Sequence, residues 1–308
     1  MIDLATADGR ARLETLIASA DILLQNLKPG SMDRLGFSRP RLLKDYPRLI
    51  SCTISGYGDD GPYASHKAYD MLIQAESGLS SITGSPDAPA RVGLSVVDLA
   101  AGATAHAAIL EALIARGRTG QGADIRISMF DVIADWLTVP LLNAEAGNEP
   151  RRMGLAHVSI APYGAFRSRD GKDIVISIQS EREWKKFTAD VLEQPELPDD
   201  PRFANMVERV RHRALTDQVV ADCFARMTRD ELLKRLSDAG IAFSEVNTMA
   251  DLAKNPQLRR IEVGTPNGRV SYPAPAPIVV GQPRHYGAVP GIGDHSDLSL
   301  ASRPRARP

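Results

Sequence analysis

The chain has 308 residues, of which 43% are hydrophobic and 24% are charged, and its formal net charge is −1. This composition is typical of a globular protein with one large domain or two ordinary domains, and it gives no support to a nucleic-acid partner. No apolar run approaches the roughly 20 residues that a membrane-spanning helix needs, and the N-terminus lacks the pattern of a signal peptide. We therefore expect a cytoplasmic enzyme without a membrane partner.

The first half of the chain alternates helix and strand signals. Helices are predicted after a cap at Thr6, at 40–46, at 70–79, at 99–115 and from Met129 onward. Strands rich in apolar or β-branched residues are predicted at 21–27, 49–55 and 123–128. Alternation of this kind predicts a layered α/β fold with a mostly parallel sheet.

The pattern changes after Pro150. Asp170-Gly171 is expected at the tip of a turn between two strands, and helices are predicted at 181–192, 214–226 and 229–238. Residues 262–292 carry proline or glycine every few positions and are interpreted as an extended return segment, and the tail from Ser302 is expected to be disordered. The predicted division is a large domain at 1–155, a smaller α/β domain at 156–265, and the return segment with the tail at 266–308.

The segment from Gly56 to Gly61 matches the pattern G-x-G-x-x-G of dinucleotide-binding proteins. That motif works by directing a helix N-terminus at a pyrophosphate. Here Asp59 and Asp60 would place negative charge against the phosphates, and Pro62 follows without a long helix behind it. We therefore interpret the segment as a turn and do not expect a nicotinamide or flavin cofactor.

Cysteine and histidine positions give no support to a metal site. Cys52 and Cys223 lie far apart, and His66, His106 and His295 have no ligand spacing. No metal and no disulfide are expected.

Asp98 stands at the junction between the extended stretch 91–98 and an alanine-rich run at 99–115. A carboxylate there would lie at the positive end of the helix dipole beside unpaired backbone N–H groups, and both favour its ionised form. An ionised carboxylate can attack a carbonyl, so Asp98 is a candidate nucleophile. Aspartate is also a preferred N-cap residue, so a purely structural capping role is the alternative.

Three further segments accompany Asp98: residues 25–36, residues 55–62 followed by 67–70, and the glycine-rich connection 116–122. The first segment leaves a strand end, where ligands of open α/β sheets bind, and its Lys28 and Arg34 suit a phosphorylated ligand. Taken singly, each segment also fits an ordinary role as a capped loop, a turn or a solvated basic pair.

Taken together and in order, these segments resemble the family III CoA-transferases, which include formyl-CoA transferase and acyl-CoA racemases. The resemblance extends over residues 3–297. Its most specific motifs are Asn26-Leu-Lys-Pro-Gly30 with Arg34, Ser55-Gly-Tyr-Gly58 with Gly61-Pro62, and Tyr69-Asp70 with Gln74-Ala-Glu-Ser-Gly78. Further matches are Gly84, Asp98 to Gly102, Thr119-Gly-Gln-Gly122, Ile160 to Phe166, and Gly293-Asp-His-Ser296.

The resemblance implies a Rossmann-like large domain, a smaller α/β domain and an intertwined homodimer. It implies that Asp98 attacks the thioester of an acyl-CoA to give a mixed anhydride and then holds CoA as an aspartyl thioester. Coenzyme A would enter as a thioester substrate, with a carboxylic acid as the second substrate, and no cofactor would be bound permanently. The resemblance places these residues in the CoA site: Asn26, Leu27, Lys28, Arg34, Lys67, Ala68, Tyr69, Asp70 and Met129.

Tyr69 bears on the reaction class. Racemases of this family usually carry histidine before the aspartate because they need a base for the proton alpha to the thioester. Tyrosine is a poor base near neutral pH, so the sequence favours a transferase, with racemase as the alternative. His157 is a candidate for contact with the acyl group, or a structural histidine.

The chain departs from the family at both ends. Relatives begin with a strand, a helix and a strand that this sequence lacks, and the short basic tail replaces their last helix. A start codon placed too late explains the difference, as does a truncated CoA-binding remnant without turnover. The segment from Arg151 to Tyr163 is most similar to relatives that act on small dicarboxylic acyl groups. Arg151 and Arg152 could pair with a distal carboxylate, although exposed arginines are also typical of solvated surface.

Overall fold

A computed structural model describes residues 1–296 of the chain. It contains two compact units, one formed by Met1–Pro150 with Glu262–Ser271 and the segment from Val279, the other by Arg151–Ile261 with Tyr272–Ile278. The domain limits drawn from the sequence, at 155 and 265, stay a prediction beside this division. The expected disorder of the tail from Ser302 lies outside the described residues.

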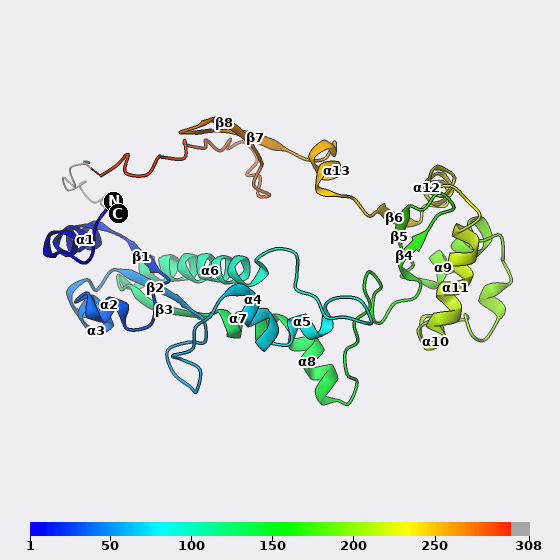
Figure 1. Ribbon diagram of the computed structural model, residues 1–308, viewed down its shortest axis with the longest axis horizontal. Coiled ribbons are helices and arrows are strands. Elements are labelled where there is room, and N and C mark those ends of the chain that lie inside the picture. The colour runs from blue at the N-terminus through cyan, green and yellow to red at the C-terminus, as the bar shows by residue number, and fades with distance from the viewer. Residues whose placement is uncertain (297–308) are drawn as a thin grey trace. The chain divides into compact units, whose positions relative to one another are not determined.

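The first unit is built on a three-stranded sheet in the order β1 (Ile22–Gln25), β2 (Ile50–Ser55) and β3 (Ala123–Ser128) (Figure 1). Both pairs are parallel, with Leu24 opposite Cys52 and Cys52 opposite Ile125. These strands lie within two residues of the predicted runs, and the expected parallel α/β architecture is confirmed. Parallel neighbours end at the same edge of a sheet, so the loops after β1, β2 and β3 share that edge.

One face of this sheet is apolar and the other is polar, because side chains alternate along each strand. Ile50 and Cys52 are fully buried on the apolar face, against which helix α6 (Val96–Thr119) packs (Figure 1). The buried side of α6 is rich in alanine, including Ala101 and Ala105. Ser51, Thr53 and Ser55 alternate with these buried positions and face a cavity described below.

The remaining helices of the first unit are α1 (Ala7–Ser19), α2 (Ser31–Arg34), α3 (Arg39–Asp45), α4 (Asp70–Glu76), α5 (Leu79–Ile82), α7 (Met129–Trp136) and α8 (Thr138–Glu145). The predicted cap at Thr6 is confirmed, since its hydroxyl accepts a hydrogen bond from the Gly9 N–H at 3.0 Å. The predicted helix 70–79 is confirmed as far as Glu76 and is wrong at residues 77 and 78. Gly78 adopts a φ of 86°, a left-handed conformation that ends α4 and separates it from α5.

Helix α6 corrects one expectation about apolar length. At 24 residues and with a mean hydropathy of 1.4 over its most apolar window, it is long and apolar enough to cross a membrane. The sequence expectation missed this because Glu111 interrupts the apolar run without lowering its average far enough. Val97, Ala101 and Ala105 of the helix pack on the sheet, as in the core helix of a layered α/β unit.

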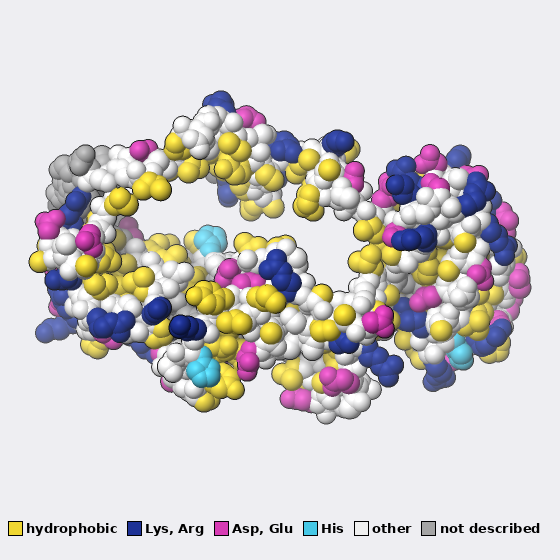
Figure 2. Space-filling view, viewed as in Figure 1, with side chains coloured by type: hydrophobic (Ala, Val, Ile, Leu, Met, Phe, Trp, Pro, Cys, Tyr) yellow, Lys and Arg dark blue, Asp and Glu magenta, His cyan; other side chains and the backbone are white. Residues whose placement is uncertain are grey.

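The second unit contains an antiparallel sheet of β4 (Tyr163–Arg167), β5 (Asp173–Ser177) and β6 (Ala242–Glu245). The predicted turn at Asp170-Gly171 joins β4 to β5, and Gly171 has a φ of 76°. Helices of this unit are α9 (Glu181–Asp190), α10 (Met206–Arg211), α11 (Arg213–Phe224), α12 (Arg229–Asp238) and α13 (Met249–Lys254). Lysine and arginine side chains are interspersed with acidic ones over the face of this unit seen in Figure 2, as on a solvated surface.

The core of the second unit encloses a charged residue, Arg209. Its side chain is fully buried, and its guanidinium lies 4.9 Å from the ring centroid of Trp184. It donates to Glu181 at 2.7 Å and to the backbone carbonyls of Ala161 at 2.9 Å and Phe203 at 3.1 Å. A buried cation is tolerated only when its donors are paired in this way.

The return segment is more regular than its proline and glycine content predicts. Strands β7 (Arg260–Thr265) and β8 (Gly268–Pro273) form a two-stranded sheet. A positive φ of 111° at Gly268 lets the chain reverse between them, so the glycine that indicated a loop is part of the turn. The segment 262–292, interpreted as an extended return, therefore contains strand residues at 262–265 and 268–273.

Candidate active site

Asp98 is the third residue of α6, in its first turn, and its side chain is exposed. The N-cap position belongs to Ser95, three residues earlier, so the interpretation of Asp98 as an N-cap is wrong. Within residues 1–296, the Asp98 carboxylate accepts no hydrogen bond and joins no ion pair. A charged oxygen without a protein partner is free to meet a ligand.

The helix end does not act on Asp98 as the sequence suggested. Burial is the larger cause that raises the pKa of Asp98 above its ordinary value, and the nearby negative charge of Asp70 raises it further. The expectation of a pKa held down by the helix end is therefore wrong in direction. The physical reason is that the first N–H groups of α6 are directed at another carboxylate.

That carboxylate is Asp70, the first residue of α4 and a buried group. Its Oδ2 accepts hydrogen bonds from the backbone N–H groups of Val97 at 2.8 Å and Asp98 at 3.2 Å. Its Oδ1 accepts from the Gln74 amide at 2.5 Å. Asp70 and Asp98 are thus brought together at the start of α6, although 28 residues separate them.

The loop between β2 and α4 is held by aromatic contacts. The Tyr63 and His66 rings are stacked with centroids 4.6 Å apart, and Tyr57 meets both rings edge-on. Ala68 lies against Gly56, where a Cβ would come within 2.1 Å of the Ala68 Cβ. The G-x-G-x-x-G segment forms bends, and the next helix begins at Asp70.

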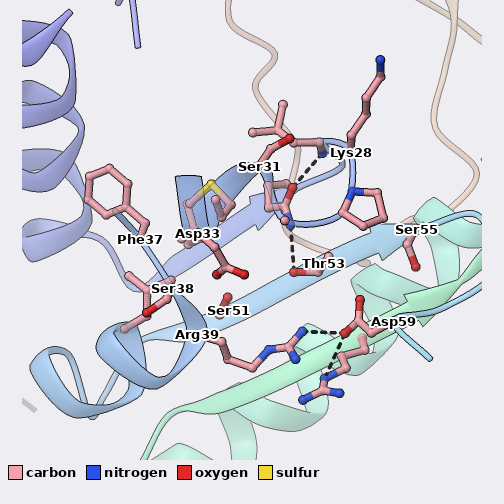
Figure 3. A pocket seen from close by; sticks show the side chains of 18 of the residues that line it. Lys28, Ser31, Asp33, Phe37, Ser38, Arg39, Ser51, Thr53, Ser55 and Asp59 are labelled. Carbon is pink, nitrogen blue, oxygen red and sulfur yellow. Dashed lines mark hydrogen bonds and ion pairs between the residues drawn. The ribbon is translucent and has the colours of Figure 1, made fainter. Parts of the chain in front are cut away.

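A cavity of about 690 Å³ lies over the polar face of the first sheet and under the loop that follows β1 (Figure 3). Leu27 and Lys28 line it, together with Ser51, Thr53 and Ser55. The Lys28 side chain extends away from the strands, so its ammonium is open to solvent (Figure 3).

Three charged groups on this face are paired in ion pairs, whereas Asp33, which also lines the cavity, joins none within residues 1–296. Asp59 binds Arg39 at 2.7 Å and lies 3.5 Å from Arg126, and Arg39 also binds Asp124 at 2.8 Å. Figure 3 shows Asp59 between the two guanidinium groups. The cavity therefore offers hydroxyl groups and neutralised ion pairs along its floor, with Lys28 as the positive group at its rim.

Leu27 and Lys28 are the predicted CoA residues that line the cavity, and the other residues predicted for that site lie elsewhere in the first unit. Neither Asp98 nor the segment 67–70 lines the cavity. Lys67 and Tyr69 are exposed in the loop before α4, and Asn26 and Arg34 are exposed after β1, with Arg34 donating to the Ser31 hydroxyl at 2.8 Å. Ala68 and Met129 are partly buried against the core of the first unit.

His157 lies in the second unit, where its ring stacks on Tyr163 with centroids 5.3 Å apart. Its Nδ1 accepts a hydrogen bond from the Ser159 N–H at 3.2 Å. These contacts orient the ring, whichever role it has. The sequence noted Gln74 only as part of a motif and gave it no role of its own. The available signal was an amide four residues after Asp70, on the same face of a predicted helix. The structure shows that this amide is fully buried.

Comparison with known proteins identifies a matching family and several relatives of this chain. The family model described as CoA-transferase family III matches residues 1–296. An acyl-CoA transferase from Fusarium pseudograminearum is 36% identical over 258 residues, which cover 83% of this chain and 56% of that protein. An acetyl-CoA:oxalate CoA-transferase from Acetobacter aceti is 35% identical over 276 residues, which cover 89% of this chain and 70% of that protein.

Solved structures agree with this assignment. A CaiB/BaiF family protein from Brucella suis superposes with a TM-score of 0.76 at 33% identity, over 91% of this chain and 74% of that one. The present chain spans little more than half the length of the Fusarium relative. Because the family model extends over nearly all of its residues, the chain belongs to CoA-transferase family III, a family of enzymes.

Proposed function

We propose that the chain is an acyl-CoA:carboxylate CoA-transferase with Asp98 as its nucleophile. An Asp98 oxygen attacks the acyl carbonyl of the donor and the carbon–sulfur bond breaks, so that CoA leaves as a thiolate and the acyl group stays on Asp98 as a mixed anhydride. The thiolate attacks the aspartyl carbonyl, which releases the donor acid and leaves CoA as an aspartyl thioester. The acceptor carboxylate repeats the two exchanges in reverse order and regenerates Asp98. Division into covalent steps lowers each barrier.

The observation that carries this proposal is the free carboxylate of Asp98. Asp70 accepts the N–H groups that a carboxylate at the start of α6 would otherwise bind, so Asp98 keeps both oxygens available. Its exposure gives a thioester access from solvent. The raised pKa also suits a nucleophile, because a more basic carboxylate forms a stronger bond to the carbonyl carbon.

Coenzyme A is proposed to bind along the loops at the carboxyl edge of the sheet. Lys28 and Arg34 would meet phosphate groups, and the apolar atoms of Leu27 would meet the pantetheine or adenine. The other residues proposed for this site are Asn26, Lys67, Ala68, Tyr69, Asp70 and Met129. The exposure of Lys28, Arg34 and Lys67 supports a role in meeting a charged ligand, since none of them forms an ion pair within residues 1–296.

The proposed acyl group is a small dicarboxylic one. The Acetobacter relative is named for oxalate, a dicarboxylate, which supports this class. Arg151 and Arg152 are candidates for the distal carboxylate. Steady-state rates with dicarboxylic and monocarboxylic acyl-CoA donors of equal length test the class, and a preference for the monocarboxylic donor would refute it.

The proposed partner is a second copy of the chain. Large hydrophobic side chains of α6 and α8 are exposed, a feature typical of protein interfaces: Leu99, Leu110, Ile114, Val139, Leu141 and Leu142. Open hydrophobic side chains are visible on the face of the first unit in Figure 2. Light scattering of the purified chain measures its mass directly; a monomer at micromolar concentration would exclude the dimer.

The nucleophile is tested by trapping the covalent intermediate. The full chain is incubated with succinyl-CoA, treated with hydroxylamine or borohydride, and mapped by peptide mass spectrometry. Asp98→Asn removes the nucleophile, and Asp87→Asn is the matched control because Asp87 is another exposed carboxyl of the same unit. We expect an adduct on Asp98 in the unsubstituted chain and in the control, and none in Asp98→Asn.

Other outcomes have defined meanings. An adduct that persists in Asp98→Asn refutes the assignment of the nucleophile, and the absence of an adduct with a panel of acyl-CoA donors refutes the transferase. Exchange of the alpha proton with deuterated water, without an acceptor acid, would identify the racemase. CoA binding without either reaction would identify a remnant without turnover. The exposed phenol of Tyr69 supports transferase over racemase, because a phenol is a weak base at neutral pH.

A further inference from the structure

The first turn of α6 takes its cap from another helix. Backbone N–H groups in a first turn usually bind the side chain of the N-cap residue, yet Ser95 at that position forms no such bond. Asp70 of α4 accepts the N–H groups of Val97 and Asp98 instead. A carboxylate is the strongest acceptor that a protein can offer there, because its charge also interacts favourably with the helix dipole.

Gln74 extends this contact into a hydrogen-bond chain. The fully buried amide donates from Nε2 to Asp70 Oδ1 at 2.5 Å, and its Oε1 accepts from the backbone N–H of Val92 at 2.8 Å. Asp70 and Gln74 lie four residues apart and therefore share one face of α4. The chain ties together α4, the extended segment before α6, and the first turn that carries Asp98.

We propose that Asp70, held by Gln74, is a positioning residue for Asp98. By accepting the backbone N–H of Asp98 itself, it fixes the turn from which the reactive carboxylate projects, and it frees the Asp98 side chain from any capping role. This inference rests on the proposed function, in which Asp98 is the nucleophile. Asp70 would act on the reaction rate by orienting Asp98, because a displacement of about 1 Å at a reacting group can cost about 100-fold in rate.

The direction of each hydrogen bond provides a sharp test. Asp70→Asn keeps one acceptor for Val97 and Asp98 but replaces Oδ1 by an NH₂ group, which meets the NH₂ group of Gln74. Gln74→Glu in the same chain restores the pairing, since a carboxylate at position 74 accepts from both the amide introduced at position 70 and the Val92 N–H. The negative charge is kept and moves from position 70 to position 74.

The experiment measures kcat, KM for succinyl-CoA and the rate of adduct formation on Asp98 for the full chain and its variants. For Asp70→Asn we expect a fall in kcat of about 10- to 100-fold with a much smaller change in KM, because both Asp70 oxygens are held by donors of the protein and its place in the proposed CoA site adds no bond to the substrate. The double variant Asp70→Asn/Gln74→Glu should recover most of that loss. Asp87→Asn, the exposed control, should match the unsubstituted chain.

The pH profile separates positioning from simple folding support. Among residues 1–296, burial and the charge of Asp70 are the two causes that raise the pKa of Asp98. Asp70→Asn removes this charge, so the acid limb of kcat should move to lower pH, whereas the double variant carries the charge at position 74 and its limb should lie closer to that of the unsubstituted chain. A merely structural role would change only the fraction of folded protein, measured by circular dichroism, and kcat and the rate of adduct formation per folded molecule would then match those of the unsubstituted chain.

The outcomes distinguish this inference from the proposed function. If Asp98→Asn abolishes the adduct while Asp70→Asn behaves like Asp87→Asn, the positioning role is refuted and the nucleophile stands. If the unsubstituted chain forms no adduct, the proposed function fails and the inference fails with it. If Asp70→Asn does not fold, the double variant decides. A double variant that stays unfolded, or folds without regaining the rate of adduct formation, overturns the inference because its hydrogen bonds have been restored.

Discussion

Replacement of Arg209 by methionine tests how the core of the second unit is stabilised. Methionine keeps much of the apolar stem, so the main loss is the guanidinium. That loss leaves the buried carbonyls of Ala161 and Phe203 without their donor, at about 1–3 kcal/mol each before relaxation. Glu181 regains water because its side chain is 46% exposed. We expect Arg209→Met to lower the free energy of unfolding by about 3 kcal/mol.

The assay uses the two tryptophans of the chain. Trp136 belongs to the first unit and Trp184 is fully buried beside Arg209 in the second, so a Trp136→Phe background makes fluorescence report the second unit alone. With a slope of about 2 kcal/mol per molar urea, the midpoint should fall by about 1.5 M.

Arg211 supplies the matched control for this experiment. It lies on the same helix as Arg209, but its side chain is 67% exposed and pairs with Glu208 at the surface. Arg211→Met should change the unfolding free energy by less than about 0.5 kcal/mol. Equal midpoints for Arg209→Met and Arg211→Met would refute the reasoning, because the cost of burying the cation would then cancel its hydrogen bonds.

Two further predictions concern pH and backbone space. Burial acts to raise the pKa of Glu181, but the hydrogen bond and charge of Arg209 outweigh it, and the net pKa lies below the ordinary 4.5. A depressed carboxyl pKa stabilises the fold above its unfolded value and loses that effect as the pH falls through the folded value. Glu181→Gln should therefore be less stable than the unsubstituted chain at neutral pH, and the urea midpoints of the two proteins should converge as the pH falls below 4.5. A difference between the two midpoints that stays constant with pH would contradict this. Gly122→Ala should lower the thermal unfolding midpoint, because its Cβ would lie 2.0 Å from the Leu49 carbonyl oxygen. Gly117→Ala lies in open space on α6 and should raise the free energy of unfolding by about 0.5–1 kcal/mol. Shifts of the thermal midpoint in the same direction for both variants would refute the distinction.

Local patterns in the sequence predict much of the first unit. Runs of apolar or β-branched residues give β1, β2 and β3, and Thr6 gives the start of α1, because each signal depends only on neighbours along the chain. The same logic places the turn at Asp170-Gly171. The strand β6 was not predicted, since its partner β5 lies more than sixty residues earlier and pairs with it only in the folded unit.

The candidate site follows the same division between local and distant signals. The order of motifs makes Asp98 a candidate nucleophile, and the structure places Leu27 and Lys28 in the lining of a cavity, while the capping of α6 could not be predicted. Its acceptor stands 28 residues before Asp98, so no spacing rule for helix caps applies to it. The expected direction of the Asp98 pKa failed for that reason, because the N–H groups thought to face Asp98 are bound by Asp70.

The cap supplied by α4 also limits how the reactive segment can be transplanted. A designer who moves α6 alone into another scaffold would carry the proposed nucleophile with an uncapped first turn, because Ser95 makes no capping bond. The smallest portable fragment runs from Asp70 through α6. It includes Gln74, the Val92 N–H, and the donor and acceptor of each hydrogen bond that links Asp70 and Gln74 to the start of α6. Catalytic design on this fold therefore has to treat two helices and their connection as one component.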